Sequence, residues 1–247
     1  FTTPDWVKQA VFYQIFPDRF RDGNAANNQK AGVFFYNEPF GTIQRSSDTE
    51  WNTTVCDPRQ DTNNACEGSY SRNFYGGDLQ GITQQIPYLK ELGVTALYLN
   101  PIFESPSNHR YDTRDFSRVD DNVGGKAAFD GMMTALKGEG FKVVLDGVFN
   151  HTSSDSVYFD RYKRYNDTKF GVGACESNTA PRAKWYPFFP HEGEGAAMCS
   201  NNRDYPKWFG IFDSLPVLNT ASTTIKNFIY GTGFNHTWSI GKEPIGP

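Results

Sequence analysis

Short apolar runs alternate with amphipathic segments in the first 150 residues of the chain. Runs rich in β-branched and aromatic residues predict buried strands at 11–16, 94–99 and 141–149. Apolar residues recur at helical spacing over 80–92 and 129–136, and glycine follows each segment. Because strands and helices alternate and the strands are apolar almost throughout, the pattern predicts a parallel sheet covered by helices.

Two long segments interrupt this alternation. Residues 22–73 and 152–217 are polar and glycine-bearing without a sustained period, so we expect an elaborated loop and a small inserted subdomain. A further helix is expected at 220–229. The three expected strands are fewer than the eight of a (β/α)8 barrel. The pattern alone leaves open whether they form a small open sheet or the first part of a barrel.

The composition narrows the class of partner. The chain has 247 residues, 38% of them hydrophobic, and a net charge of -4, so it can build a substantial core but offers no electrostatic reason to bind nucleic acid. No apolar stretch approaches the roughly 20 residues of a membrane span, so no membrane partner is expected. Aromatic residues make up 16% of the chain. Aromatic rings are ordinary core material, and they also suit the apolar face of a sugar; composition does not decide between the two.

Four cysteines fall in two local pairs. Cys56 and Cys66 flank one polar loop, and Cys175 and Cys199 flank another. Three connectivities are open to four cysteines, and we expect nearest-neighbour pairing. Zinc is the alternative, although neither spacing matches a short zinc motif. Two loop-closing disulfides would indicate an oxidising compartment, so we expect a secreted or extracytoplasmic protein.

Polar and aromatic side chains gather where two of the expected strands end. Asp146, Asn150 and His151 follow the third strand, and His109 and Tyr111 follow the second. The carboxyl ends of parallel strands are where α/β enzymes build their sites. A cap-and-turn cluster is the structural alternative for either group alone. Two such clusters on consecutive strands favour a functional site.

Oxygen-bearing side chains also cluster in the loop after the first strand. Asp22, Asn24, Asn27 and Asn28 surround a glycine, and residues 76–78 (Gly-Gly-Asp) follow the long polar segment. Calcium takes six to eight oxygen ligands, including amide and backbone carbonyl oxygens. The chemistry therefore favours a calcium site over an Asx-rich turn without metal.

Six motifs occur in an order that resembles the α-amylase family (glycoside hydrolase family 13). They are VFYQIFPDRFRDGN, GGDLQGI, GVTALYLNPIF, HRYDTRDF, DGVFNH and LPVLN. Such an ordered set is far more specific than one short motif. The resemblance implies an α/β fold that is the N-terminal part of a (β/α)8 TIM barrel, with its first three strands and an inserted domain B. It places the barrel domain at 1–151, domain B at 152–217 and an incomplete return to the barrel at 218–247.

The resemblance also implies roles for the residues at the strand ends. Tyr111 would stack on the sugar in the cleavage subsite, and His109 and His151 would hydrogen-bond its hydroxyls. Asp146 would help hold the arginine and the nucleophile of the site. Asn150 would contribute to a calcium site between barrel and domain B.

A second calcium site follows from likeness to the cyclodextrin glucanotransferases and related amylases. The pattern DGNxxNN…GGD is similar to their site. The ligands implied are Asp22, Asn24, Asn27, Asn28, the carbonyl of Gly76, and Asp78.

The implied activity is hydrolysis of α-1,4 or α-1,6 bonds in starch, pullulan or maltodextrins by a retaining double displacement. Amylopullulanase and neopullulanase-like members look most similar. A glucan transglycosylase and a non-catalytic glucan-binding module are the alternatives. The family's nucleophile, in a G-x-R-x-D motif, and its acid/base Glu have no match here, so no catalytic residue is predicted in this chain. We expect the chain alone to be inactive and the remaining C-terminal part of the same enzyme to be its partner.

Overall fold

The computed structural model describes residues 2–30, 36, 44–45, 71, 73–166, 170–200 and 202–232. The predicted pair Cys56 and Cys66 lies outside these residues. The chain divides into two compact units, one of Ala10–Val148 and one of Phe1–Gln9 with Phe149–Pro247. Each unit is described by itself. The proposed domain limits at 151 and 217 stay predictions.

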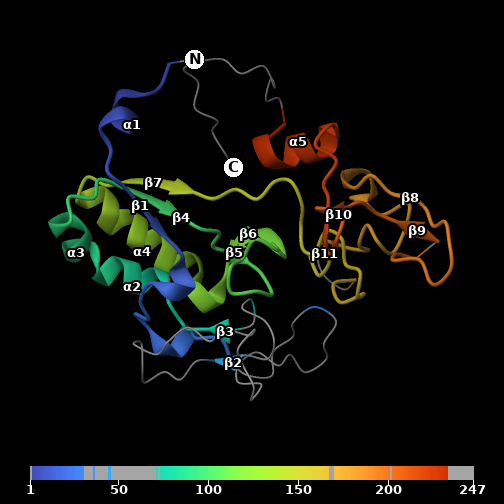
Figure 1. Ribbon diagram of the computed structural model, residues 1–247, viewed down its shortest axis with the longest axis horizontal. Helices are drawn as coiled ribbons and strands as arrows, with labels where there is room; N and C mark the ends of the chain where they lie inside the picture. Colours follow the sequence, from blue (N-terminus) through green and yellow to red (C-terminus); the bar gives the residue numbers. More distant parts are fainter. Residues whose placement is uncertain are drawn as a thin grey trace. The chain divides into compact units, whose positions relative to one another are not determined.

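A three-stranded parallel sheet forms the centre of the first unit (Figure 1). Its order is β1 (Phe12–Ile15), β4 (Ala96–Leu99) and β7 (Lys142–Leu145). Ile15 pairs with Leu99, and Leu99 pairs with Leu145, so residues at equal height lie on one face. The predicted parallel sheet is confirmed. The third strand is shorter than expected because residues 146–149 leave the ladder.

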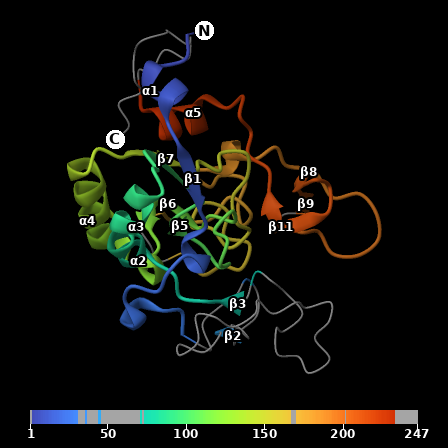
Figure 2. The same ribbon diagram turned by 60° about the vertical axis from the view of Figure 1, so that its left-hand side comes forward.

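Three helices cover one face of this sheet: α2 (Leu79–Gln84), α3 (Ile86–Glu91) and α4 (Gly125–Gly138) (Figures 1 and 2). Their apolar sides meet the strands in a core that includes Ile82, Leu89, Leu97, Met132 and Leu136, each fully buried.

The helix predicted over 80–92 is two short helices. Pro87 stands in the first turn of α3 and has no N–H for an intrahelical bond, so the chain breaks at Gln85.

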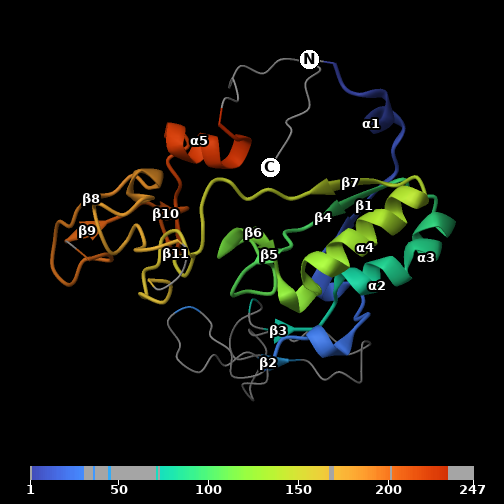
Figure 3. The same ribbon diagram turned by 180° about the vertical axis from the view of Figure 1, so that it is seen from behind.

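Short strands and 3-10 helices lie in the loops that follow the strands of the first unit. β5 (Phe103–Glu104) and β6 (Asp115–Val119) form an antiparallel pair after β4 (Figures 1 and 3). β2 (Gln44–Arg45) pairs in parallel with β3 (Asn73–Phe74). The 3-10 helices here are η1 (Pro17–Arg19), η2 (Ala25–Asn27) and η4 (Asp121–Val123).

The second unit consists mostly of loops around an aromatic core. Its elements are α1 (Asp5–Gln9), η5 (Ala183–Trp185), β8 (Phe189–Pro190), β9 (Arg203–Asp204), β10 (Lys207–Trp208), β11 (Phe212–Pro216) and α5 (Thr223–Tyr230). The rings of Tyr158, Phe159, Trp185, Tyr186 and Tyr205 are buried and contact one another in pairs. In this unit the aromatic surplus of the sequence therefore serves as core.

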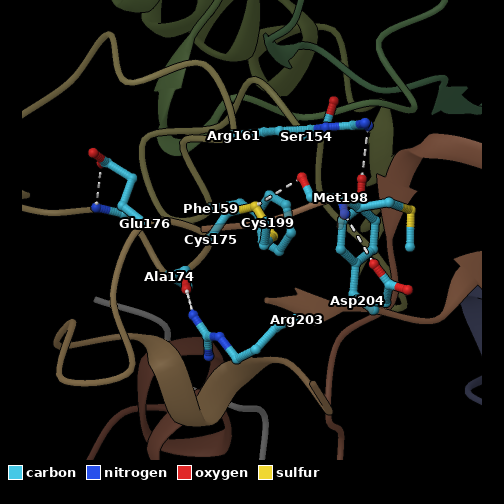
Figure 4. The surroundings of a disulfide bond; sticks show 12 residues. Ser154, Phe159, Arg161, Ala174, Cys175, Glu176, Met198, Cys199, Arg203 and Asp204 are labelled. Atoms are coloured by element: carbon cyan, nitrogen blue, oxygen red, sulfur yellow. Dashed lines mark hydrogen bonds between the residues drawn. A yellow bond between two sulfur atoms is a disulfide. The ribbon is translucent and has the colours of Figure 1, made fainter. Parts of the chain in front are cut away.

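A disulfide closes the loop that contains β8 (Figure 4). It joins Cys175 to Cys199 across a sequence separation of 24 residues, which confirms the nearest-neighbour pairing for this pair. Beside it, the Arg203 guanidinium donates to the Ala174 carbonyl at 3.0 Å and lies over the Phe188 ring at 4.0 Å. In the described part of the chain, no helix has the length and apolar character needed to cross a membrane.

Candidate functional site

Asp146 is the centre of a hydrogen-bonded group at the carboxyl ends of β4 and β7. Its amide donates to the Leu99 carbonyl at 3.0 Å, which places the side chain directly after the paired part of β7. The Tyr111 hydroxyl, from the β5–β6 connection, donates to the Asp146 carboxylate at 2.9 Å. Tyr98 of β4 also donates a side-chain hydrogen bond to Asp146. Asp146 and Tyr111, predicted from separate strand ends, are thus in contact.

The two tyrosines at Asp146 stay protonated over the physiological range. Burial and the hydrogen bond to Asp146 raise the pKa of Tyr111 to about 12. The same two causes raise the pKa of Tyr98 above its ordinary value. A phenol that keeps its proton remains a donor to the carboxylate. The arrangement therefore fixes the Asp146 carboxylate by hydrogen bonds, beside the partly exposed Tyr111 side chain.

Residues 108–112 alternate between buried and partly exposed side chains. Asn108, Arg110 and Asp112 are only 2%, 1% and 1% exposed, whereas His109 and Tyr111 between them are partly exposed. The His109 and Tyr111 rings lie side by side, with centroids 5.9 Å apart and an interplanar angle of 33°. This strip, residues 108–112, thus leaves two rings partly exposed and buries the three polar side chains between and beside them.

A backbone contact sets the tautomer of His109. The Tyr111 amide lies 3.1 Å from the His109 Nδ1 and donates to it. Because a backbone amide only donates, Nδ1 accepts, and the neutral ring carries its proton on Nε2. The side chain is 36% exposed. His109 therefore offers an oriented N–H donor suited to a hydroxyl oxygen.

The buried Asp112 carboxylate is surrounded by hydroxyl donors. Ser105, Ser107 and Tyr36 all hydrogen-bond to it. Burial alone would raise the pKa of Asp112, but the neighbouring His109 side chain and these hydroxyl donors together hold it below its ordinary value. No pattern in the sequence marked the two serines, because their role depends on how the loop folds back on Asp112.

Asn150 and His151 lie in the second unit. His151 is 4% exposed, forms an isolated β-bridge with Val217, and its ring lies 5.2 Å from that of Trp208. The Asn150 side-chain amide is 2.6 Å from the His151 Nδ1. The Asn150 carbonyl accepts the Leu218 amide at 2.9 Å. These contacts join residues 150–151 to the segment after β11.

The Asp78 carboxylate organises the loop that was predicted to bind calcium. It caps α2 by accepting the Gly81 amide at 2.6 Å. It also accepts the Gly23 and Asn24 amides at 3.1 and 3.0 Å and the Asn27 side-chain amide at 3.0 Å. A carboxylate has about four lone-pair sites, and these four bonds use them. Burial raises the pKa of Asp78 despite these bonds. Asp78 therefore supports the loop, and one bond would have to break before it could bind a metal.

Two buried oxygen atoms in this loop fit a hard cation. Asn27 Oδ1 and Asn28 Oδ1 are buried and have no hydrogen-bond partner among the described residues. Such buried acceptors are costly unless something donates or coordinates to them. Asn28 Oδ1 lies against Gly76, where an added Cβ would be 2.5 Å from it, and Asn28 donates to Asp22 at 2.7 Å. The described residues contain no group of three His, Cys, Asp or Glu side chains placed for a metal. The donor set is therefore mainly amide and carbonyl oxygen, which calcium accepts.

A parallel sheet with helices packed on it, and polar side chains at the carboxyl ends of its strands, defines an α/β protein with its site at the strand ends. The chain belongs to the α-amylase family: the family model "Alpha amylase, catalytic domain" matches residues 14–230. The three-stranded sheet is the N-terminal part of that family's (β/α)8 barrel.

Characterised relatives are several times longer than this chain. The amylopullulanase of Thermoanaerobacter thermohydrosulfuricus is 41% identical over 256 residues, a match that covers 99% of this chain and 16% of that protein. Neopullulanase 2 of Thermoactinomyces vulgaris is 42% identical over 64% of this chain and 22% of its own length. The solved type III pullulan hydrolase from Thermococcus kodakarensis has a TM-score of 0.67 and 29% identity, over 90% of this chain and 35% of its own. The chain thus spans about a sixth of the first of these relatives.

Proposed function

We propose that the whole protein hydrolyses α-glucosidic bonds in pullulan, starch or maltodextrins with retention of configuration. Relatives named amylopullulanase, neopullulanase and pullulan hydrolase support this substrate class. The observation that carries the proposal is the hydrogen bond between Tyr111 and Asp146, beside a partly exposed His109 whose neutral ring carries its proton on Nε2. A ring face next to an oriented donor is suited to a pyranose and its hydroxyls.

Within this proposal the described residues bind the sugar and do not break the bond. The Tyr111 ring covers the sugar face, and His109 donates to a hydroxyl. Asp146, held by the hydroxyls of Tyr98 and Tyr111, orders the polar floor of the site. Retention needs two carboxylates roughly 5 Å apart, one as nucleophile and one as acid/base. We propose that the remaining C-terminal part of the same enzyme supplies both.

The test is product analysis with the whole protein. Cleavage of pullulan at α-1,6 bonds yields maltotriose, cleavage at α-1,4 bonds yields panose-type trisaccharides, and NMR of the first product reports the anomer. Asp146→Asn and His109→Ala should lower kcat/KM on the order of a hundredfold each, with Lys137→Ala on the outer side of α4 as control. Transfer products in place of free sugar would favour a transglycosylase. Glucan binding without turnover would favour a binding module.

We further propose a structural calcium ion held by the loop around Asn27 and Asn28. The two buried amide oxygens of Asn27 and Asn28 support the proposal. The proposed ligand set is completed by Asp22, Asn24, the carbonyl of Gly76, and Asp78. Calorimetric titration of chelator-treated protein with calcium should give one binding event, and Asn28→Ala should abolish it. Asn178→Ala, at an exposed position of the second unit, is the control. Unchanged binding in Asn28→Ala would refute the site.

We also propose that the protein is secreted or extracytoplasmic. The disulfide between Cys175 and Cys199 supports this, since such bonds persist in oxidising compartments. Fractionation of the source cells, followed by thiol labelling, tests it. Recovery in the cytosol with both thiols reduced would contradict it.

A further inference from the structure

Arg110 lies between His109 and Tyr111 in the sequence, and its backbone adopts a conformation that is rare for arginine. Its φ is +59°, in the left-handed region, and its residue is 1% exposed. A non-glycine residue persists in this region only where surrounding contacts hold it. The buried Arg110 side chain is placed to supply such contacts.

Two contacts hold the Arg110 guanidinium. Its Nε donates to the Asp120 carboxylate at 2.8 Å, and its Nη1 donates to the Asn108 carbonyl at 2.8 Å. Asp120 is itself fixed, because its other oxygen accepts the amide and side chain of Asn122 at the start of η4. Asn108 is also fixed, by donating its side chain to the Asn73 carbonyl at 2.8 Å. The ion pair thus joins the ring-bearing strip to the turn that leads into α4.

The left-handed turn at Arg110 brings the His109 and Tyr111 side chains into their hydrogen-bonding positions. With residue 110 in this conformation, the Tyr111 amide reaches the His109 Nδ1, and the Tyr111 hydroxyl reaches Asp146. Neither contact involves the Arg110 side chain, yet both depend on the backbone that it holds.

We propose that Arg110 is a positioning residue: its buried ion pair with Asp120 holds the left-handed turn that presents His109 and Tyr111 to a glucan. That His109 and Tyr111 contact a glucan rests on the proposed function. The ion pair and the turn that it holds involve only contacts between described residues. Arg110 and Asp120 would thus support the sugar-binding residues without contacting the substrate themselves. A carboxylate left buried without its guanidinium partner is unfavourable, so loss of Arg110 should loosen the strip.

The test compares three variants of the whole protein. Arg110→Gly accepts a positive φ but loses both donor contacts, and Arg110→Lys keeps the charge without the planar fork. Arg118→Ala is the matched control, because Arg118 lies on β6 of the same hairpin and pairs with Glu104 and Asp121 while 52% exposed. Two quantities are measured: kcat and KM on a pullulan oligosaccharide, and the titration of the Tyr111 phenol, followed by NMR of ring-labelled tyrosine.

We expect Arg110→Gly to lower kcat/KM by tenfold to a hundredfold, roughly the cost of a 1 Å misplacement. The Tyr111 pKa, about 12 in the unaltered protein, should fall toward the ordinary phenol value as its contact with Asp146 loosens. The kcat/KM and Tyr111 pKa of Arg110→Lys should lie between those of Arg110→Gly and the unaltered protein. Both quantities in Arg118→Ala should match the unaltered protein.

The proposal is wrong if the folded Arg110→Gly protein keeps its Tyr111 titration, or if Arg118→Ala shows the same losses. If Arg110→Gly does not fold, the titration of Arg110→Lys decides by the same criterion. Because the titration needs no substrate, a protein that neither binds nor cleaves glucan would refute the proposed function while the positioning role is still tested.

Discussion

At the scale of single residues, the site is held by buried polar groups that face away from the presumed sugar. Tyr111 and Asp146 were predicted from strand ends, because apolar runs locate strands and polar clusters after them locate the active edge of a parallel sheet. Arg110, Ser105 and Ser107 were not predicted as supports. Their contacts depend on a left-handed residue in a loop, and no periodic pattern encodes that conformation.

Asp112 gives a prediction about pH. The pKa of its carboxyl is below its ordinary value, so its stabilising contribution is complete above the unfolded-state pKa of about 4 and is lost as pH falls through the lower folded-state pKa. Asp112→Asn should therefore cost about 1–3 kcal/mol at neutral pH, from the weakened hydroxyl bonds. The difference from the unaltered protein should shrink below about pH 4. Urea unfolding at a series of pH values measures this, and a difference that persists undiminished at low pH would contradict it.

At the scale of elements, the order and type of the sheet and its helices follow from the sequence, and their ends do not. The three apolar runs became the three parallel strands, as near-continuous apolar runs alternating with helical segments predict. The helical spacing of apolar residues continues across Pro87, so a prediction from spacing alone merged α2 and α3 into one helix. The missing N–H of proline was the signal for the break.

Helix α4 gives a prediction about the core. Leu136 is fully buried between α4 and the sheet, so Leu136→Ala should destabilise the protein by about 2–5 kcal/mol through lost burial and a cavity. Lys137→Ala, one position further along the same helix and exposed, should change the free energy of unfolding by no more than about 0.5 kcal/mol. Thermal and urea unfolding of the pair measure the contrast. Equal effects of the two substitutions would mean that α4 does not pack as described.

The loop closed by Cys175 and Cys199 gives a second prediction at this scale. Closing a loop with a sequence separation of 24 residues restricts the unfolded chain, worth about 3 kcal/mol in the chain-entropy account. The double variant Cys175→Ser/Cys199→Ser should lose stability by about that amount, and hydrogen exchange should show the loss at Tyr158, Phe159 and Tyr205. The unit of Ala10–Val148 should be affected less. Uniform acceleration of exchange along the whole chain would contradict a local role.

At the scale of the whole molecule, the order of the motifs identified the family, and the parallel sheet agrees with it. Within the described residues of the unit Ala10–Val148, helices α2, α3 and α4 cover the sheet face that includes Ile15, Leu97 and Leu99. Phe12 alternates to the opposite face and is 44% exposed. Large apolar side chains exposed on a sheet indicate surface that something else covers. The periodicity of the sequence could not show that this face is exposed. An apolar strand has the same pattern whether neighbouring helices or distant parts of the protein cover it.

The final prediction concerns what covers that face. The chain spans about a sixth of the amylopullulanase that it matches, so we expect further parts of the whole protein to pack over Phe12. A cysteine introduced as Phe12→Cys should react with a maleimide rapidly in the 247-residue chain and at least about tenfold more slowly in the whole protein, because local opening must then precede reaction. Lys137→Cys, on the solvent side of α4, should react at the same rate in both, and the protein without an added cysteine gives the background. Equal reactivity of Phe12→Cys in the two proteins would mean that the sheet face stays open, and the (β/α)8 barrel would then not close over this side in the whole protein.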